Sequence, residues 1–164
     1  LKSPKETGKS FKSNSELKAK YFFRKAKIFT ISDDSGLCVD CLNNSPGIYS
    51  ARWAKKYGNF NNAGKKIIEL VKNKNKNKKI KNYKAKFICS LTFYFGSKKK
   101  ITTTGIIKGK ISEKLLGKKG FGYDPIFIPR GNKVTFGQMA KRKKILMDHR
   151  YLAFKKLKHK VNTL

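Results

Sequence analysis

The stretch YKAKFICSLTFYFGSKKKITTTGIIKGKI, residues 83–111, decides the fold class of this chain. Its first half, 83–95, is rich in aromatic and β-branched residues. Its second half, 98–111, alternates in a similar way after a break at Gly96 and Ser97. Two such runs joined by a short break predict a long β-hairpin.

Helical patterns lie on both sides of this hairpin. Residues 10–26 have apolar residues at helical spacing behind a possible N-cap, Ser10, and residues 61–73 repeat that period. Two more helices are expected near the end of the chain, one starting at Thr135 and one capped by Asp148. In the last helix the residues expected to face inward are Leu152, Phe154, Leu157 and Val161.

Two short strands complete the pattern. Residues 27–31 are β-rich and lead to Asp33 and Asp34, so we expect these carboxylates just past a strand end. A second short strand precedes the break at Pro129. Helix and strand alternate irregularly around one long hairpin, so the fold class is α/β with a mixed sheet.

Composition limits the classes of function. A length of 164 residues fits one domain, and a net charge of +32 normally suggests nucleic acid or another anionic partner. However, 36 of the 41 basic residues are Lys and 5 are Arg, which is typical of an AT-rich coding sequence and lacks the Arg that specific recognition favours. We therefore expect only non-specific contact with nucleic acid. The densest lysine run, 72–84, is predicted as a solvated loop or helix end.

Location and cysteine use are less informative. No apolar run reaches the ~18 residues of a membrane span, and the polar N-terminus lacks a signal-peptide pattern, so we expect a cytoplasmic protein without a membrane partner. Cys38 and Cys41 have CxxC spacing, but no second pair or nearby His completes a zinc site. We interpret them, with Cys89, as core cysteines.

The carboxylates are the first chemical signal. The chain has 9 acidic residues, and two of them, Asp33 and Asp34, stand directly before Ser35 and Gly36. Adjacent carboxylates can hold a divalent metal and position a water, while Ser35 and Gly36 can offer a hydroxyl and backbone N–H groups to a phosphate. An Asx-turn, in which an aspartate caps its own backbone, is equally compatible with this tetrapeptide.

Two other groups are weak signals when taken alone. The loop GFGYDP, 120–125, carries Phe121 and Tyr123, which could stack on a base or simply fill the core. His149 and Arg150, at a helix start, could read a base edge or an anion, or form a cap and a surface ion pair.

Taken in order, seven motifs closely resemble the inosine triphosphate pyrophosphatase family of the Ham1 type. The motifs are ETG (6–8), NSELKA (14–19), DDSGLCVD (33–40), PGIYSAR (46–52), GFGYDPIF (120–127), TFGQM (135–139) and HR (149–150). The resemblance implies a homodimer that uses Mg²⁺ to hydrolyse ITP, dITP and XTP to the monophosphate and pyrophosphate. It also implies a long mixed sheet flanked by helices, with two lobes and a central substrate cleft.

The resemblance also implies roles for particular residues on the phosphate side. Asp34 looks like the proton acceptor and a metal ligand, and Glu6 like a second metal ligand. Ser35 would contact the substrate. Lys18 and Lys144 would be cleft cations that face the triphosphate.

On the base side, the resemblance makes Phe121 the residue that stacks on the purine. The rest of that wall would comprise Gly122, Tyr123 and Asp124. His149 and Arg150 would read the purine 6-oxo group, because a donor there accepts inosine and xanthosine but refuses the amino group of adenine.

The family places a strand and a Ser/Thr-x-Asn-x-x-Lys phosphate loop ahead of the ETG motif, whereas this sequence begins at Leu1, five residues before it. We therefore expect a single domain, 1–164, that lacks the N-terminal strand and phosphate loop and is nearly inactive as it stands. An enzyme of the family is the favoured hypothesis. A basic nucleic-acid-binding module and an inactive fragment of the enzyme are the alternatives.

Overall fold

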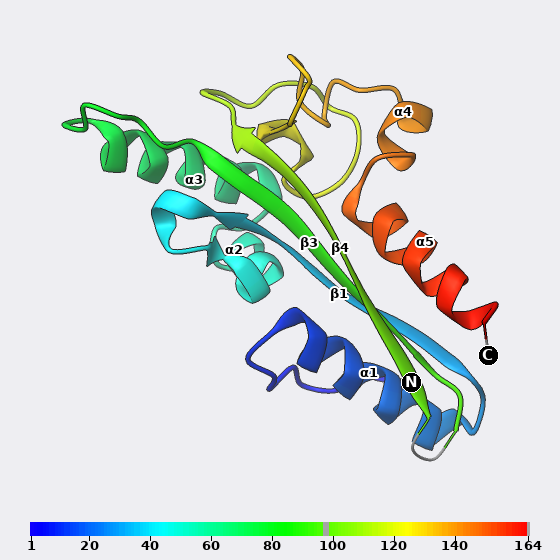
Figure 1. Cartoon of the computed structure of the whole chain (residues 1–164). Helices are drawn as coiled ribbons and strands as arrows, with labels where there is room; N and C mark the ends of the chain where they lie inside the picture. Colours follow the sequence, from blue (N-terminus) through cyan, green and yellow to red (C-terminus); the bar gives the residue numbers. More distant parts are fainter. Residues whose placement is uncertain (97–98, 164) are drawn as a thin grey trace. The chain divides into compact units, whose positions relative to one another are not determined.

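The computed structural model describes residues 1–96 and 99–163, and Ser97, at the predicted hairpin break, lies outside the described residues. A five-stranded sheet with the order β2-β1-β3-β4-β5 forms the centre of the fold (Figure 1). Its strands are β1 (Thr30–Val39), β2 (Ser45–Pro46), β3 (Lys84–Tyr94), β4 (Lys100–Ile111) and β5 (Phe127–Pro129). Short 3-10 helices are η1 (Asp40–Leu42), η2 (Gly47–Tyr49) and η3 (Asp124–Ile126).

The predicted β-hairpin is confirmed as β3 and β4. At one end the Ile111 N–H donates to the Tyr83 carbonyl at 2.9 Å, and farther along the hydroxyls of Thr92 and Thr102 lie 3.0 Å apart. Both contacts belong to the same antiparallel register. The β-branched and aromatic content of the two runs therefore predicted the longest strands of the sheet correctly.

The α/β class, with a long sheet flanked by helices, is confirmed. The pairs β1–β2 and β4–β5 are antiparallel, and Figure 1 shows β1, β3 and β4 also alternating in direction. Among the described strands the sheet is thus antiparallel rather than mixed in direction, because each long strand returns along its neighbour.

The chain groups into two compact units. Unit 1 comprises Leu1–Ser35, Ile88–Ile106 and the segment from Asp148 onward, and unit 2 comprises Gly36–Phe87 and Ile107–Met147. Two units agree in number with the two lobes that the resemblance implied. The central cleft stays a prediction.

Helix α1 (Phe11–Ala26) belongs to unit 1 and begins as predicted. The Ser10 side chain accepts a hydrogen bond from the Ser13 N–H, and the Ser13 side chain accepts one from the Ser10 N–H, which is a reciprocal capping box. The helix meets β3 through the hydroxyls of Ser15 and Thr92, 2.8 Å apart. These contacts fix the part of α1 that carries Asn14 and Lys18.

Helix α5 (His149–Val161) lies in the same unit and is capped by Asp148, whose carboxylate accepts the Tyr151 N–H at 2.8 Å. Thr103 donates to the Ala153 carbonyl at 2.8 Å. Because Thr103 points away from the face that carries Thr102, α1 and α5 cover opposite faces of these strands. The inward orientation predicted for Phe154 is wrong, since its side chain is 52% exposed and Ala153 takes the buried position.

Unit 2 holds the main hydrophobic core. Helix α3 (Phe60–Asn75) confirms the predicted helix, with Asn59 as its N-cap, and α2 (Ser50–Lys56) precedes it. The core residues include Leu37, Val39, Ala63, Ile67, Val71, Phe87, Ile126, Phe127 and Phe136. The lysine-rich run forms the exposed end of α3 and the loop after it, as expected.

Two local predictions are wrong. Strand β1 continues through Asp33 and Asp34, so these carboxylates lie within a strand and not past its end. No helix starts at Thr135: its N–H donates to the Gln138 side chain, and its hydroxyl donates to the Leu116 carbonyl at 2.6 Å. These tertiary contacts hold 135–139 in turns, and helix α4 spans Lys141–Ile145.

The cysteines are free, and Cys38 and Cys89 are buried, as expected of core cysteines. Burial raises the pKa of each of these two thiols to about 11. Cys41 is only half-buried. Within residues 1–96 and 99–163, no helix is long and apolar enough to cross a membrane.

Candidate active site

Three charged side chains from different segments meet in unit 1. Glu6 comes from the loop before α1, Lys18 from α1, and Asp34 from β1. The Lys18 ammonium lies 2.7 Å from Glu6 Oε1 and 3.4 Å from Asp34 Oδ1. Asp34 is almost fully buried, so its carboxylate is largely shielded from water. The structure therefore brings together the three residues predicted for metal and phosphate chemistry.

The pKa values in this group are shifted by burial and by the neighbouring charges. Burial raises the pKa of Asp34 and outweighs the lowering by the Lys18 charge and the Asn14 amide. For Lys18, burial acts to lower the pKa, but the hydrogen bond to Glu6 and the charge of Asp34 overcome it and raise the pKa. Asp34 is therefore a stronger proton acceptor than an ordinary aspartate, which suits a general base.

Asn14 is a member of this group that sequence reasoning missed. Its side chain is fully buried, its Nδ2 donates to Asp34 Oδ2 at 3.1 Å, and its Oδ1 accepts the Gly8 N–H at 2.8 Å. Asn14 thus links the loop that carries Glu6 to the carboxylate of Asp34. The sequence did contain a signal for Asn14. It lies one helical turn before Lys18 in NSELKA, so the two side chains share one face of α1.

Asp33 belongs to a different group on the opposite face of β1. Its Oδ2 accepts the Ser35 hydroxyl at 2.7 Å and lies 3.4 Å from Arg150 Nε. His149 Nε2 lies 3.5 Å from an Arg150 guanidinium nitrogen. Successive strand residues point to opposite faces, so Asp34 faces α1 while Asp33 and Ser35 face α5. The two aspartates therefore act separately, and the Asx-turn alternative does not apply.

In unit 2 the two aromatic residues of the GFGYDP loop differ in exposure to solvent. Phe121 is 68% exposed, whereas Tyr123 is buried and donates its hydroxyl to the Ser50 carbonyl at 2.9 Å. The ring of Phe60, the first residue of α3, lies edge-on to both, with centroid distances of 5.1 and 5.2 Å. Phe60, another residue that sequence reasoning missed, thus supports an exposed ring that is available for stacking.

Asp124 holds the backbone of this loop. Its Oδ2 accepts the Phe121 N–H at 2.6 Å and lies 2.7 Å from the Lys144 ammonium. Gly120 has φ +82°, and a Cβ there would overlap the Asp124 carboxylate, so glycine is required. Gly122 also has a positive φ, of 67°. Lys144 therefore compensates a buried carboxylate, and its contact with a triphosphate stays a prediction.

A hollow of about 390 Å³ opens beside the exposed ring of Phe121. Its lining includes Phe60 and two lysines, Lys118 and Lys119. The volume lies at the lower end of the usual range for small-molecule sites. An aromatic ring next to cations can accommodate a planar base and an anionic group.

The model of the Ham1 family matches residues 1–160. The chain belongs to the Ham1 family. The resemblance that the seven motifs indicated is thereby confirmed.

The relatives are similar over most of their length. A Dictyoglomus thermophilum protein named dITP/XTP pyrophosphatase is 44% identical over 94% of this chain and 74% of its own length. A Clostridium perfringens protein of the same name is 41% identical over 93% of this chain and 76% of its own. The solved structure of a HAM1 protein from Coxiella burnetii has a TM-score of 0.91 at 26% identity, covering 100% of this chain and 82% of its own.

Proposed function

We propose that this Ham1 family protein hydrolyses dITP, XTP and ITP to the nucleoside monophosphate and pyrophosphate, and so removes deaminated purines from the nucleotide pool. The observation that carries the proposal is the 44% identity, over nearly the whole chain, to a protein named dITP/XTP pyrophosphatase. The group of Glu6, Lys18 and Asp34 supports it, because hydrolysis of a triphosphate needs a base together with charge compensation.

Asp34 is the proposed general base. It accepts a proton from the attacking water, and its raised pKa supports this role because it strengthens the base. Asn14 and Lys18 bind the two carboxylate oxygens and keep them from rotating. Preorganised contacts of this kind avoid the cost of reorienting groups during the reaction.

Magnesium is the proposed metal, with Glu6 and Asp34 as its protein ligands. Mg²⁺ is usually bound by one or two carboxylates together with substrate phosphates. The donor set fits, since the two carboxylates converge on one cation, the Lys18 ammonium. Among the described residues no group of three or more His, Cys, Asp or Glu could hold a metal, so the phosphates would complete its coordination. The bound ion would offset the negative charge of the triphosphate.

For base recognition we propose that Phe121 stacks on the purine and that His149 and Arg150 donate hydrogen bonds to its 6-oxo group. The exposure of Phe121 and its support by Phe60 favour stacking. The Arg150 side chain is half-exposed and has five N–H donors, so its contact with Asp33 leaves others for a ligand. Ser35, held by Asp33, is a further proposed substrate contact.

Steady-state release of pyrophosphate from dITP, ITP, XTP, ATP and GTP, with Mg²⁺ present, tests the proposal. In protein that also carries the family's N-terminal strand and phosphate loop, we expect turnover of the three deaminated nucleotides and little of ATP or GTP. The 6-amino group of adenine is a donor and would face other donors. Guanine keeps the 6-oxo group, so discrimination against GTP must act at its 2-amino group. Equal rates on ATP, or release of orthophosphate alone, would overturn the proposal. On the basis of the family resemblance we also propose a homodimer. From the polar N-terminus and the lysine-rich charge of the sequence we propose a cytoplasmic protein that binds nucleic acid only weakly and non-specifically.

Asn14→Ala should lower kcat for dITP by about 10–100-fold, the usual loss when a supporting partner of a ligand is removed. The change also leaves the Gly8 N–H without its acceptor, so the loop that carries Glu6 should loosen. Titrating Mg²⁺ in the kinetic assay should then show a weaker apparent affinity. A kcat and Mg²⁺ dependence equal to those of the unmodified protein would contradict this role.

Phe121→Ala should raise KM for dITP by more than it lowers kcat, because stacking acts on the bound substrate and the transition state alike. The expected loss is about 1–3 kcal/mol. Since the ring is largely exposed, the unfolding midpoint should change little. The matched variant Phe154→Ala removes another exposed phenyl ring, on α5, and should leave KM unchanged. If KM is also unchanged in Phe121→Ala, the ring has no part in binding the base.

A further inference from the structure

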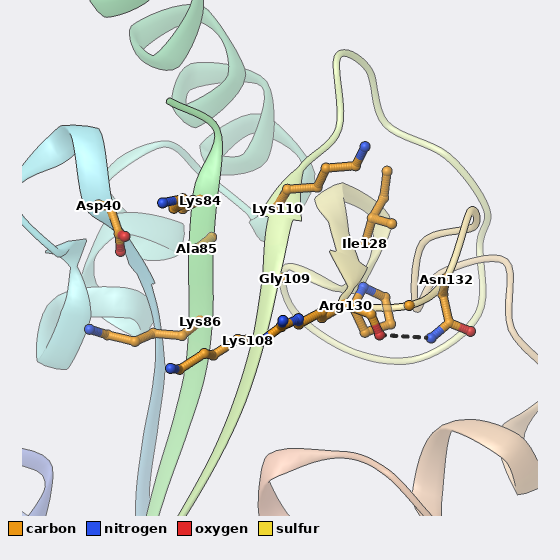
Figure 2. Close-up of a pocket in the computed structure, with 12 residues that line it drawn as sticks. Asp40, Lys84, Ala85, Lys86, Lys108, Gly109, Lys110, Ile128, Arg130 and Asn132 are labelled. Carbon is orange, nitrogen blue, oxygen red and sulfur yellow. Dashed lines mark hydrogen bonds between the residues drawn. The ribbon is translucent and has the colours of Figure 1, made fainter. Parts of the chain in front are cut away.

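A hollow of about 810 Å³ lies in unit 2, over β3, β4 and the end of β5 (Figure 2). Its charged lining consists of Lys84, Lys86, Lys108, Lys110 and Arg130, with Asp40 as the single carboxylate. We call it the basic hollow. None of these cations belongs to the groups described for catalysis or base recognition.

The register of the strands concentrates these cations. The bond between the Ile111 N–H and the Tyr83 carbonyl places Lys84 directly opposite Lys110, and Lys86 opposite Lys108. Side chains of directly opposite residues lie roughly 5 Å apart, and like charges in such positions destabilise a sheet. The sheet therefore carries two repulsive pairs side by side.

Arg130 extends one of these pairs into a row. Its N–H donates to the Lys108 carbonyl at 2.9 Å, which continues the pairing of β4 with β5. Lys86 on β3, Lys108 on β4 and Arg130, the residue directly after β5, therefore follow one another across the sheet. In Figure 2 the Lys86 and Lys108 side chains extend in the same direction from β3 and β4.

Strand alternation explains why the cations share one face. Ala85 and Phe87 turn their side chains into the hydrophobic core, so Lys84 and Lys86 must point to the other face of β3. Lys86 is half-buried, which adds a desolvation cost to the repulsion. A bound anion would offset both costs.

We propose that the basic hollow binds a compact anion made of consecutive phosphates, at a site separate from the catalytic groups. The Cβ atoms of these residues lie roughly 5 Å apart across the strands and roughly 7 Å apart along them, so the flexible side chains can bring several cations to one phosphate chain. Lysine acts as a point charge toward phosphate and needs no fixed orientation. The volume of the hollow is within the range of small-molecule sites.

Two other occupants are less compatible with this surface. The lining contains no aromatic residue, so the bases of a single-stranded nucleic acid would find no stacking platform. A second copy of the chain placed symmetrically on this face would bring like charges together. A phosphate chain, either free or as the tail of a nucleotide, meets neither obstacle.

Calorimetric titration with inorganic tripolyphosphate, ATP and a short oligothymidylate, without Mg²⁺, tests the proposal. The test variant is Lys86→Gln with Lys108→Gln, and the control is Lys20→Gln with Lys25→Gln on α1, which removes the same charge from exposed positions. We expect the test variant to bind tripolyphosphate at least about tenfold more weakly at this site, and the control to change by less than about twofold. Pyrophosphate release from dITP should be unchanged in both.

Each result decides the proposal. Equal weakening in both variants would show that only net charge attracts the anion, and undiminished binding in the test variant would place the anion elsewhere; either would overturn the proposal. Stronger loss for oligothymidylate than for tripolyphosphate would indicate a nucleic-acid groove instead. Similar losses for ATP and tripolyphosphate would identify a nucleotide tail as one source of the ligand, and loss for tripolyphosphate alone would identify free polyphosphate.

The thermal midpoint of the test variant should be equal to that of the unmodified protein or higher, because repulsion between opposite lysines is removed.

Discussion

Asp34→Asn is expected to reduce kcat for dITP by about 10²–10⁴, the scale on which enzymes lose rate without a general base. The amide keeps the shape of the carboxylate but accepts no proton, and it removes a negative charge next to Lys18. Steady-state kinetics at matched Mg²⁺ measures the loss. Near-normal kcat in a folded variant would exclude Asp34 as the base.

The chain offers a matched control for this experiment in the adjacent residue. Asp33→Asn makes the same chemical change on the opposite face of β1, where the carboxylate contacts Ser35 and Arg150. Its expected loss is less than about tenfold in kcat, since it affects positioning and not proton transfer. Circular dichroism and thermal melting of both variants separate catalytic loss from unfolding.

Gly105→Ala is expected to destabilise the protein by about 3 kcal/mol, a large effect for one methyl group. A Cβ at Gly105 would overlap the His149 carbonyl and the Ala153 amide of α5. Backbone atoms cannot rotate away as a flexible side chain can, so β4 and α5 must separate. Because His149 and Arg150 begin α5, we also expect impaired discrimination of dITP from ATP.

Denaturant unfolding measures this effect, and Gly64→Ala in α3 is its control. A Cβ at Gly64 would meet its nearest neighbour, Ile126 Cγ2, at 3.4 Å, an ordinary contact. Alanine is also the better helix former, so the control should change stability by no more than about 1 kcal/mol. If the two variants unfold at the same denaturant concentration, α5 does not pack closely on Gly105.

Local sequence patterns determined the long elements and the family of this chain. Alternating β-branched and aromatic residues predicted the hairpin of β3 and β4, and the caps Ser10 and Asp148 marked the starts of α1 and α5. These features act over a few residues, so they are present in the sequence itself. The ordered motifs likewise indicate the Ham1 family without reference to the fold.

Contacts between distant segments decided the rest. Pairing within the sheet extended β1 through Asp33 and Asp34 and sent the two carboxylates to opposite faces, which no local pattern specifies. Packing of α1 on the sheet brings the buried Asn14 side chain into hydrogen-bond contact with Asp34. Lys144, which the sequence predicted to contact the substrate, instead forms an ion pair with the Asp124 carboxylate. Two lysines of the basic hollow come from β3 and two from β4, and only the register of these strands makes the two pairs neighbours. Such placements depend on long-range packing energies, which a sequence window of a few residues does not contain.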